Sequence, residues 1–581
     1  MKILKTEMFL FCRLAAVVAC ALCAPVASAA NTWVGVAATE NSALVTNIGV
    51  RIPSPDGRYN ILLTRVQGAG RKVTLVNSVP EDQFQPKTSY IDYLKPGDAV
   101  SYDRPSLIDM ASGKTIEIDN ALFGNPWSLD RWTWKADGSA FRFVYNARGH
   151  QTMRVIEVST NGVVRAIVDE RCDTFFCYSS KMFLEFLDKT DELVWMSERS
   201  GWNHLYLYDT KTGTAKNAIT SGEWVVKSVE SIDYAARKVY FMAVGVAKGQ
   251  DPYYAHYCVA NLDGTGFHVL TEGDGTHSVK VMPGGLEFED TWSRVDLPPV
   301  VELRSRVDGH LIRELSRTDA DAERKSGWRP PERFSVPGRD GMTPIYGIIW
   351  RPKNFDPAKR YPVIENIYAG PHDAHVPKAF LKTSRCNELA DEGFIVVQID
   401  GMGTNWRSKK FHDVAWKNLA DAGFPDRIAW MRAAAVAHPE MDISRVGVYG
   451  GSAGGQNAMG ALLFHGEFYK AAVADCGCHD NRMDKIWWNE QWMGWPVGPE
   501  YAADSNITNA HRLKGSLLLM VGEVDSNVDP SSTYKVVDAL IKADKDFEFL
   551  MIPGGGHCAG LAGPYGWRRL KDFFRRKLGV E

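Results

Sequence analysis

The stretch VGVYGGSAGGQ, residues 446–456, decides which fold this sequence encodes. A short β-branched strand runs directly into a turn in which Ser452 lies among four glycines. Glycine costs backbone entropy, so this density of glycine indicates a backbone that bends sharply or is approached closely. Two explanations compete: a loop that cradles a phosphate, and a turn that pushes a serine hydroxyl into a cleft.

The spacing of the glycines argues against the phosphate-binding loops. A P-loop requires G-x-x-x-x-G-K-[ST], and no lysine follows this turn. A dinucleotide-binding turn requires G-x-G-x-x-G and an acidic residue about 20 positions further on, and this spacing fails too. Residues 450–454 do fit G-x-S-x-G, the nucleophile elbow on a strand-to-helix turn. The helix-like NAMGALLFH that follows supports this interpretation.

Around the elbow, apolar strands alternate with helix-like stretches. The strands are YPVIENIYA, GFIVVQID, RVGVYGG, AAVADCG, LLLMVGEVD and FEFLMIPGG, and a helical example is FPDRIAWMRAAAVAH. Buried strands alternating with helices are typical of a parallel sheet covered on both faces. We therefore predict an α/β-hydrolase domain with a mostly parallel, doubly wound sheet over residues 326–581.

The partners of a nucleophilic serine have a fixed order in this fold. An imidazole must accept the hydroxyl proton and a carboxylate must orient the imidazole, and they follow the serine as Asp then His, each after a later strand. Asp525 ends LLLMVGEVD, and His557 lies on the glycine-rich loop of FLMIPGGGHC. We predict a Ser452–Asp525–His557 triad, with two alternatives: Asp529 as the orienting acid, or Asp525 as a turn aspartate.

The N-terminal half has a different rhythm, of short β-type runs with little helical periodicity. One phrase, a turn followed by alternating apolar residues, recurs as SPDGRYNILLT, KADGSAFRFVY, LDKTDELVWMS, DYAARKVYFMA and VMPGGLEFEDT. From the second example the phrase starts at residues 135, 187, 233 and 281, an interval of about 50 residues that is typical of propeller blades. We predict a β-propeller over residues 30–325 with about six blades, one of them partial between residues 54 and 135. A pair of β-sandwiches is the alternative.

The extreme N-terminus predicts export. Lys2 and Lys5 precede an apolar segment that closes on Ala-Ser-Ala, so residues 1–29 read as a signal peptide, with periplasm or medium as the destination. VVAC, residues 17–20, loosely fits a lipoprotein box, the alternative. No later stretch has the 18 or more apolar residues of a membrane span. A net charge of −3 gives no electrostatic reason to expect a nucleic-acid partner.

Seven of the 10 cysteines follow the predicted signal peptide, so at least one thiol is free or pairs outside the chain. Cys172 and Cys177 could bridge a local loop, whereas Cys476 and Cys478 are too close for an easy mutual disulfide. We predict no metal site, because no CxxC pair or His-rich partner accompanies these residues. We expect no cofactor.

At the predicted triad and in several other segments, the chain resembles the prolyl oligopeptidase family of serine peptidases (S9), in particular its dipeptidyl peptidase IV-like branch. The matching segments are SERSGWNHLYLYD (197–209), IYAGP (367–371), GGSAGG, WMGWP (492–496), DSNV (525–528) and the His557 loop. The resemblance implies a triad of Ser452, Asp525 and His557, with Tyr368 and the backbone N–H of Ala453 as the oxyanion hole. It also implies substrate-binding residues, which are Asn527, Val528, Trp487 and Trp488.

The chain departs from the branch in ways that concern substrate choice. Ala453 stands where the branch usually has a bulky aromatic, and the glutamate pair that grips a substrate's free amino terminus has no clear counterpart. Glu170 is the candidate for that task, followed by Asp173. The chain is also short for the branch.

From the triad and the resemblance we expect a serine peptidase acting on short peptides and releasing N-terminal dipeptides. An oligopeptidase or acylaminoacyl peptidase of the same family is the alternative. An ester hydrolase could use the same triad. A propeller binding protein with a dead hydrolase domain is the alternative from another class. No residue string indicates a protein partner or an oligomeric state.

Overall fold

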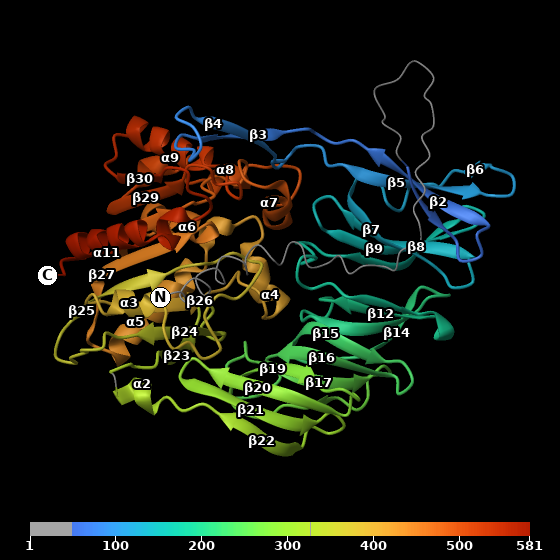
Figure 1. Cartoon of the computed structure of the whole chain (residues 1–581), viewed down its shortest axis with the longest axis horizontal. Helices are drawn as coiled ribbons and strands as arrows, with labels where there is room; N and C mark the ends of the chain where they lie inside the picture. Colours follow the sequence, from blue (N-terminus) through green and yellow to red (C-terminus); the bar gives the residue numbers. More distant parts are fainter. Residues whose placement is uncertain (1–48, 326, 581) are drawn as a thin grey trace.

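The computed structural model describes residues 49–325 and 327–580, so the predicted signal peptide lies outside the described residues. The chain forms two parts: a series of small antiparallel sheets, and a large mixed sheet flanked by helices (Figure 1). They are joined by a segment that contains α2 (Asp321–Lys325). Propeller and α/β-hydrolase architectures are therefore both present, as the sequence predicts.

The described N-terminal half contains five four-stranded antiparallel sheets, which follow one another along an arc in Figure 1. Their strands are β1 (Val50–Pro53), β2 (Tyr59–Val66), β5 (Tyr102–Asp109) and β6 (Thr115–Ile116); β7 (Pro126–Trp134), β8 (Ala140–Ala147), β9 (Thr152–Ser159) and β10 (Val164–Arg171); β11 (Leu184–Leu187), β12 (Glu192–Ser197), β13 (His204–Asp209) and β14 (Thr214–Ala218); β15 (Val225–Asp233), β16 (Lys238–Val244), β17 (Ala255–Asn261) and β18 (His268–Val269); and β19 (Thr276–Val281), β20 (Glu287–Arg294), β21 (Leu297–Ser305) and β22 (Leu311–Arg317). The repeated phrase marks the turn between the first and second strand of every one of these sheets.

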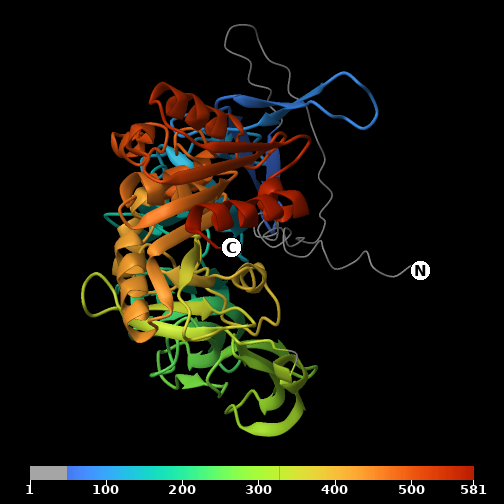
Figure 2. The same cartoon turned by 90° about the vertical axis from the view of Figure 1, so that its left-hand side faces the viewer.

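The expectation of about six blades is wrong for the described chain, because the long first interval holds no partial blade. Between β2 and β5 the chain instead leaves the first sheet and forms a hairpin of β3 (Lys72–Asn77) and β4 (Lys87–Asp92). We call residues 67–101 the arm. Figures 1 and 2 show the hairpin lying over the hydrolase domain, beside the C-terminal part of the chain.

The second half is built on one eight-stranded sheet in the order β23-β24-β26-β25-β27-β28-β29-β30. The strands are β23 (Glu332–Pro337), β24 (Pro344–Trp350), β25 (Tyr361–Asn366), β26 (Ile395–Asp400), β27 (Met441–Gly451), β28 (Tyr469–Asp475), β29 (Ser516–Gly522) and β30 (Glu548–Ile552). The first two strands run antiparallel to their neighbours and the others pair in parallel.

Helices cover both faces of this sheet, and each face has its own apolar core. One core joins the sheet to α5 (Phe424–Ala437), α6 (Ala453–Phe464) and α9 (Ser531–Lys542). The other joins it to α3 (Arg385–Ala390) and α11 (Pro564–Leu578). The remaining short helices are α4 (Lys409–His412), α7 (Ile486–Met493), α8 (Glu500–Ala503) and α10 (Ala559–Ala562). This is the arrangement predicted from the alternation of strands and helices.

The cysteines pair differently from the sequence-based expectation. The local bridge between Cys172 and Cys177 is wrong: both are free, and the Cys177 thiol, buried, lies 3.0 Å from the Ser180 hydroxyl. In the described residues the disulfide joins Cys476 and Cys558, which are 82 positions apart in sequence with a Cα–Cα distance of 5.3 Å.

None of the helices in the described ranges is both long and apolar enough to cross a membrane.

Candidate active site

Ser452 occupies a strained turn between β27 and α6. Its φ of 59° and ψ of −127° lie in a region that non-glycine residues rarely adopt. The turn can form because its neighbours lack side chains: a Cβ on Gly450 or Gly454 would lie only 2.5 or 2.4 Å from the carbonyl oxygen of Ile367. The sequence therefore folds here as a nucleophile elbow, with the serine at the N-terminus of a helix.

The predicted acid and base meet on neighbouring loops. Asp525 follows β29 and His557 follows β30, and the Nδ1 of His557 lies 2.7 Å from Oδ2 of Asp525. The Asp525 carboxylate is fully buried, and its Oδ1 accepts the backbone N–H groups of Asn527 (2.8 Å) and Val528 (2.9 Å). These bonds fix the carboxylate so that it can hold the imidazole in one orientation. The structure thus brings Asp525 and His557 together at the carboxyl ends of the parallel strands, where Ser452 also lies, at the end of β27.

The alternative acid is engaged elsewhere. Oδ2 of Asp529 lies 2.7 Å from Nζ of Lys95, a residue of the arm, and both side chains are largely buried. Geometry therefore favours Asp525 over Asp529 as the partner of His557.

Tyr368 lies beside the elbow, on the loop after β25. Burial raises the pKa of its phenol to about 12, while the side chain of Ser452 acts in the opposite direction. Its ring packs against His375 and His372, at centroid distances of 4.5 and 5.7 Å. The phenol is therefore protonated at neutral pH, and its ring lies against the elbow, 3.3 Å from where a Cβ on Gly454 would be.

A mixed apolar cluster surrounds Ala453. Trp488 and Val528 belong to it, together with Phe175, which comes from the propeller. Trp487 does not: its side chain is 44% exposed, and its carbonyl oxygen accepts the Tyr178 hydroxyl at 3.4 Å. Of the two predicted pocket walls, the structure brings only Trp488 to the elbow.

Asn527 is exposed at the same edge, two residues after the triad acid. Its backbone carbonyl accepts hydrogen bonds from Lys485 Nζ (2.7 Å) and from the Tyr93 hydroxyl (2.8 Å). The backbone of Asn527 is therefore restrained although the residue is exposed to solvent.

Glu170 is buried and already satisfied. Its carboxylate accepts from Trp195 Nε1 (2.7 Å), from Arg199 Nε (2.9 Å) and from the Ser197 hydroxyl. Asp173, three residues further on, is exposed. An incoming ammonium group would have to compete with Arg199 at Glu170, whereas no such cation pairs with Asp173 among the ion pairs of the described residues.

Three features that the sequence did not predict lie around the Asp525–His557 pair, and the first is the arm. The Tyr93 hydroxyl, buried, lies 2.5 Å from Oδ1 of Asp484 as well as near the carbonyl of Asn527. Ser78 binds Glu523 through its backbone N–H (3.2 Å) and its hydroxyl. The arm therefore contacts the loop that carries Asp525, through Asn527 and Glu523, which lie more than 400 positions further along the chain. No local sequence pattern could indicate a pairing over such a separation.

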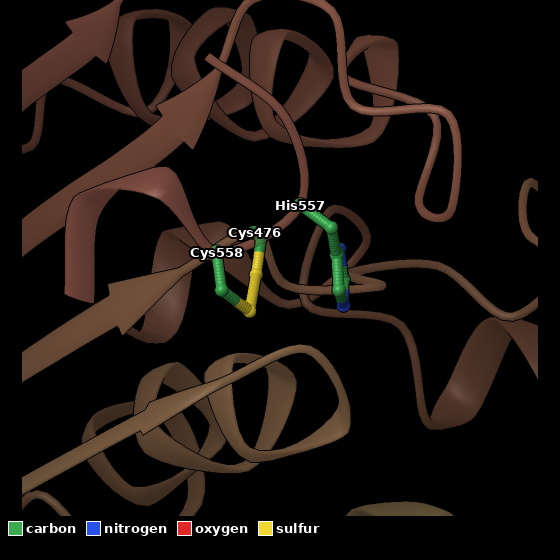
Figure 3. A group of neighbouring side chains, drawn as sticks. All are labelled: Cys476, His557 and Cys558. Carbon is green, nitrogen blue, oxygen red and sulfur yellow. A yellow bond between two sulfur atoms is a disulfide. The ribbon is translucent and has the colours of Figure 1, made fainter. Parts of the chain in front are cut away.

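The second is the disulfide. Cys558 directly follows His557, and Cys476 directly follows β28 (Figure 3). The two sulfurs and a ring nitrogen of His557 all lie within 4.8 Å of one another, so the three residues have the types and spacing of metal ligands. The cysteines are joined to each other, however, so neither is a thiolate ligand here.

The third is Asp475, the last residue of β28. Burial raises the pKa of its carboxyl to about 6, and its Oδ2 accepts the backbone N–H of Leu561 at 2.7 Å. The charges of His557 and Asp525 also act on this carboxyl. A second buried carboxyl thus lies on the strand next to the elbow, near enough to His557 and Asp525 to interact with them.

The described chain thus combines propeller sheets with an α/β-hydrolase domain, which carries a serine elbow and a His–Asp pair at its strand ends. Sequence comparison gives the family. The dipeptidyl peptidase IV (DPP IV) N-terminal region profile matches residues 54–299, and the prolyl oligopeptidase family profile matches residues 381–581. The chain belongs to the prolyl oligopeptidase family, in its dipeptidyl peptidase IV-like branch.

Individual relatives are distant. Dipeptidyl peptidase 8 of Mus musculus is 29% identical over 58% of this chain and 40% of its own length, and that of Homo sapiens is 26% identical over 70% and 50%. The chain thus matches half or less of the length of these curated relatives. The crystal structure of Porphyromonas gingivalis dipeptidyl peptidase 4 superposes with a TM-score of 0.77 at 22% identity, covering 91% of this chain and 74% of the other. That likeness concerns the fold.

Proposed function

We propose that this protein is a serine peptidase that removes dipeptides from the free amino termini of short peptides. The observation that carries the proposal is the hydrogen-bonded Asp525–His557 pair at the sheet edge where the elbow presents Ser452. Membership of the dipeptidyl peptidase IV-like branch supports the substrate class.

In this mechanism Ser452 attacks the scissile carbonyl while His557 takes the hydroxyl proton. Asp525 stabilises the imidazolium that forms and keeps the ring oriented. The Tyr368 hydroxyl and the backbone N–H of Ala453 donate to the oxyanion of the tetrahedral intermediate. His557 then protonates the leaving amine, and water hydrolyses the acyl-enzyme with His557 again as base.

The dipeptide length would be set on the propeller side of the site. Asn527 would donate to the carbonyl of the substrate's first residue. The ammonium group needs a carboxylate, because burying an unpaired charge costs several kcal/mol. Exposed Asp173 suits this task better than Glu170, whose charge already balances Arg199.

The pocket for the substrate residue before the cleaved bond would accept several residue types. Ala453 presents only a methyl group where a bulky aromatic would narrow the pocket, and Trp488 and Val528 line the same cluster. Residues larger than proline should therefore be accepted.

We also propose that residues 1–29 direct the chain to export, with residues 30–325 and 326–581 as its propeller and peptidase domains. The basic, apolar and small-residue succession of the N-terminus supports export. A periplasmic or extracellular location suits a peptidase that acts on free peptides.

The deciding experiment compares a dipeptidyl chromogenic substrate bearing a free amino terminus with its N-acetylated form. We expect cleavage of the free substrate only. Asp173→Asn should raise KM for it without changing kcat. The matched control is Asp137→Asn, because Asp137 is an exposed acid on the β7–β8 turn, whereas Asp173 follows β10 of the same sheet.

Equal rates on the two substrates would exclude the dipeptidyl function and leave an oligopeptidase or acylaminoacyl peptidase. A failure of Ser452 to react with a fluorophosphonate would instead indicate a binding protein without catalysis.

A further inference from the structure

We propose that Cys476 and Cys558 are positioning residues, and that their disulfide holds Ser452 and His557 in register so that a dithiol reductant switches the peptidase off. The proposal rests on the proposed function only in taking Ser452 and His557 as nucleophile and base. It adds a redox-sensitive covalent link to that site.

The link touches the nucleophile. The sulfur of Cys476 accepts the backbone N–H of Ser452 at 3.2 Å, alongside the carbonyl of Asp475 at 3.0 Å. A Cβ on Gly451, the residue before Ser452, would lie 2.9 Å from the sulfur of Cys558. The disulfide therefore packs directly under the strained turn, and glycine is needed at position 451 to leave room for it.

The disulfide is also next to the proposed base, His557. Cys558 is covalently next to His557 and has a left-handed backbone, with φ 54°. Beyond it, α10 is attached to β28 through the bond from Leu561 N–H to Asp475. On the N-terminal side of His557 the loop begins with Pro-Gly-Gly-Gly, residues 553–556, in which the glycines place little restraint on the backbone. The covalent anchor next to His557 is thus the strongest restraint on a glycine-rich loop.

Among the described contacts, the hydrogen bond from Leu561 N–H to Asp475 joins the same two segments, but only the disulfide joins them covalently. Asp525 fixes the ring of His557 through Nδ1, but it cannot fix the distance from the ring to Ser452, which lies on a different strand. The disulfide joins the end of β28, adjacent to β27, to the loop after β30. It therefore spans the gap across β29 between the two loops that must stay aligned.

The sulfur chemistry is accessible from one side. Cys476 is buried, whereas Cys558 is partly exposed. A thiolate of a dithiol attacks the sulfur of Cys558, and the S–S bond breaks with Cys476 leaving as thiolate. The second thiol of the reductant then attacks the mixed disulfide and releases Cys558. Two electrons pass to the protein, two thiols form, and the reductant closes into its own cyclic disulfide.

The test uses the full-length protein with and without dithiothreitol, in EDTA so that the freed thiols and His557 cannot capture a contaminating cation. Thiol alkylation and mass spectrometry report the state of each cysteine. Readouts are kcat, KM and the rate at which a fluorophosphonate labels Ser452, with circular dichroism to verify folding. The Cys476→Ser/Cys558→Ser double variant is compared with Cys258→Ala, which removes a free thiol buried in β17.

We expect reduction to lower kcat and the labelling rate on the order of 10- to 100-fold with little change in KM, because a displacement of about 1 Å has that effect on a general base. Removal of the reductant followed by oxidation should restore both. Cys258→Ala should respond like the wild type, and the double variant should be slow from the start and unaffected by dithiothreitol.

Full activity with both thiols alkylatable would overturn the proposal, as would a double variant with wild-type kcat. If the double variant fails to fold, the reduction and reoxidation of the wild type still decides. Absence of labelling in both redox states would refute the proposed function as well, whereas equal labelling in both refutes this inference alone.

Discussion

Replacing Tyr93 by phenylalanine should loosen the loop that carries the triad acid, although Tyr93 belongs to the propeller arm. Its buried hydroxyl lies 2.5 Å from Oδ1 of Asp484 and 2.8 Å from the carbonyl oxygen of Asn527. The substitution removes this hydroxyl and keeps the ring, so packing is preserved. The substitution therefore removes one hydroxyl proton, which lies between a buried carboxylate and the carbonyl of Asn527, and an oxygen that accepts the backbone N–H of Asp529 at 3.4 Å.

The size of the free-energy loss depends on the hydrogen bonds that Asp484 and Asn527 keep in the variant. A hydrogen bond to a charged group contributes about 1.5–3 kcal/mol. Asp484 keeps Lys485 Nζ at 3.0 Å and Asn489 Nδ2 at 3.1 Å, and Lys485 still binds the carbonyl of Asn527. We therefore expect a loss of about 2 kcal/mol, which corresponds to about a 30-fold fall in the protection of this loop against local opening.

Hydrogen exchange followed by mass spectrometry on peptides covering residues 520–530 measures this directly, and steady-state kinetics measure its effect on catalysis. We expect faster exchange in that segment and about a 10-fold lower kcat/KM. The control is Tyr90→Phe, because Tyr90 lies on β4 of the same arm and is 65% exposed. Unchanged exchange in Tyr93→Phe, or an equal change in Tyr90→Phe, would show that the arm does not support the triad loop.

Three further changes probe the site itself. Ser452→Ala should leave the fold intact and lower kcat on the order of 10⁵- to 10⁶-fold, measured on the dipeptidyl substrate; near-normal turnover would show that the nucleophile is another residue. Tyr368→Phe should lower kcat about 10²- to 10³-fold with a smaller effect on KM, and an effect on KM alone would mean that Tyr368 only binds substrate. Asp475→Asn concerns stability, because burial raises the pKa of Asp475 from 3.8 to about 6. The folded state then holds the proton more tightly than the unfolded chain, so stability falls as pH rises from about 4 to 6, and the variant should gain up to about 3 kcal/mol at pH 7. Thermal unfolding of both proteins between pH 4 and 8 checks this, and parallel curves would contradict it.

Local patterns were sufficient wherever the chemistry is local. The glycines around Ser452 predict the elbow because each close approach, such as that of Ile367 O to Gly454, leaves no space for a Cβ. Asp525 and His557 could be predicted because parallel strands end at one edge, which turns order along the chain into proximity. The repeated turn phrase predicted the propeller sheets because each copy joins two strands that are adjacent in sequence and hydrogen-bonded to each other.

The misses all depend on contacts between distant segments. The 54–135 interval suggested a partial blade, because strand periodicity does not distinguish a blade from the β3–β4 hairpin. The Cys476–Cys558 pairing was missed because connectivity cannot be deduced from cysteine positions alone. Trp487 and Trp488 are adjacent, and only the structure shows that one of them faces solvent while the other joins the cluster at Ala453.

The three loops of the triad are restrained by three different means, and this has a consequence for the propeller. The Ser452 loop is shaped by its own glycines and the His557 loop is anchored within the hydrolase domain, but the Asp525 loop depends on Tyr93 and Lys95 of the arm. The propeller also contributes Phe175 to the cluster at Ala453. The hydrolase domain therefore contains all three residues of the proposed triad but not every contact that orders their loops. The propeller of this chain consequently supports the Asp525 loop and contributes to the cluster at Ala453, so both domains shape the proposed active site.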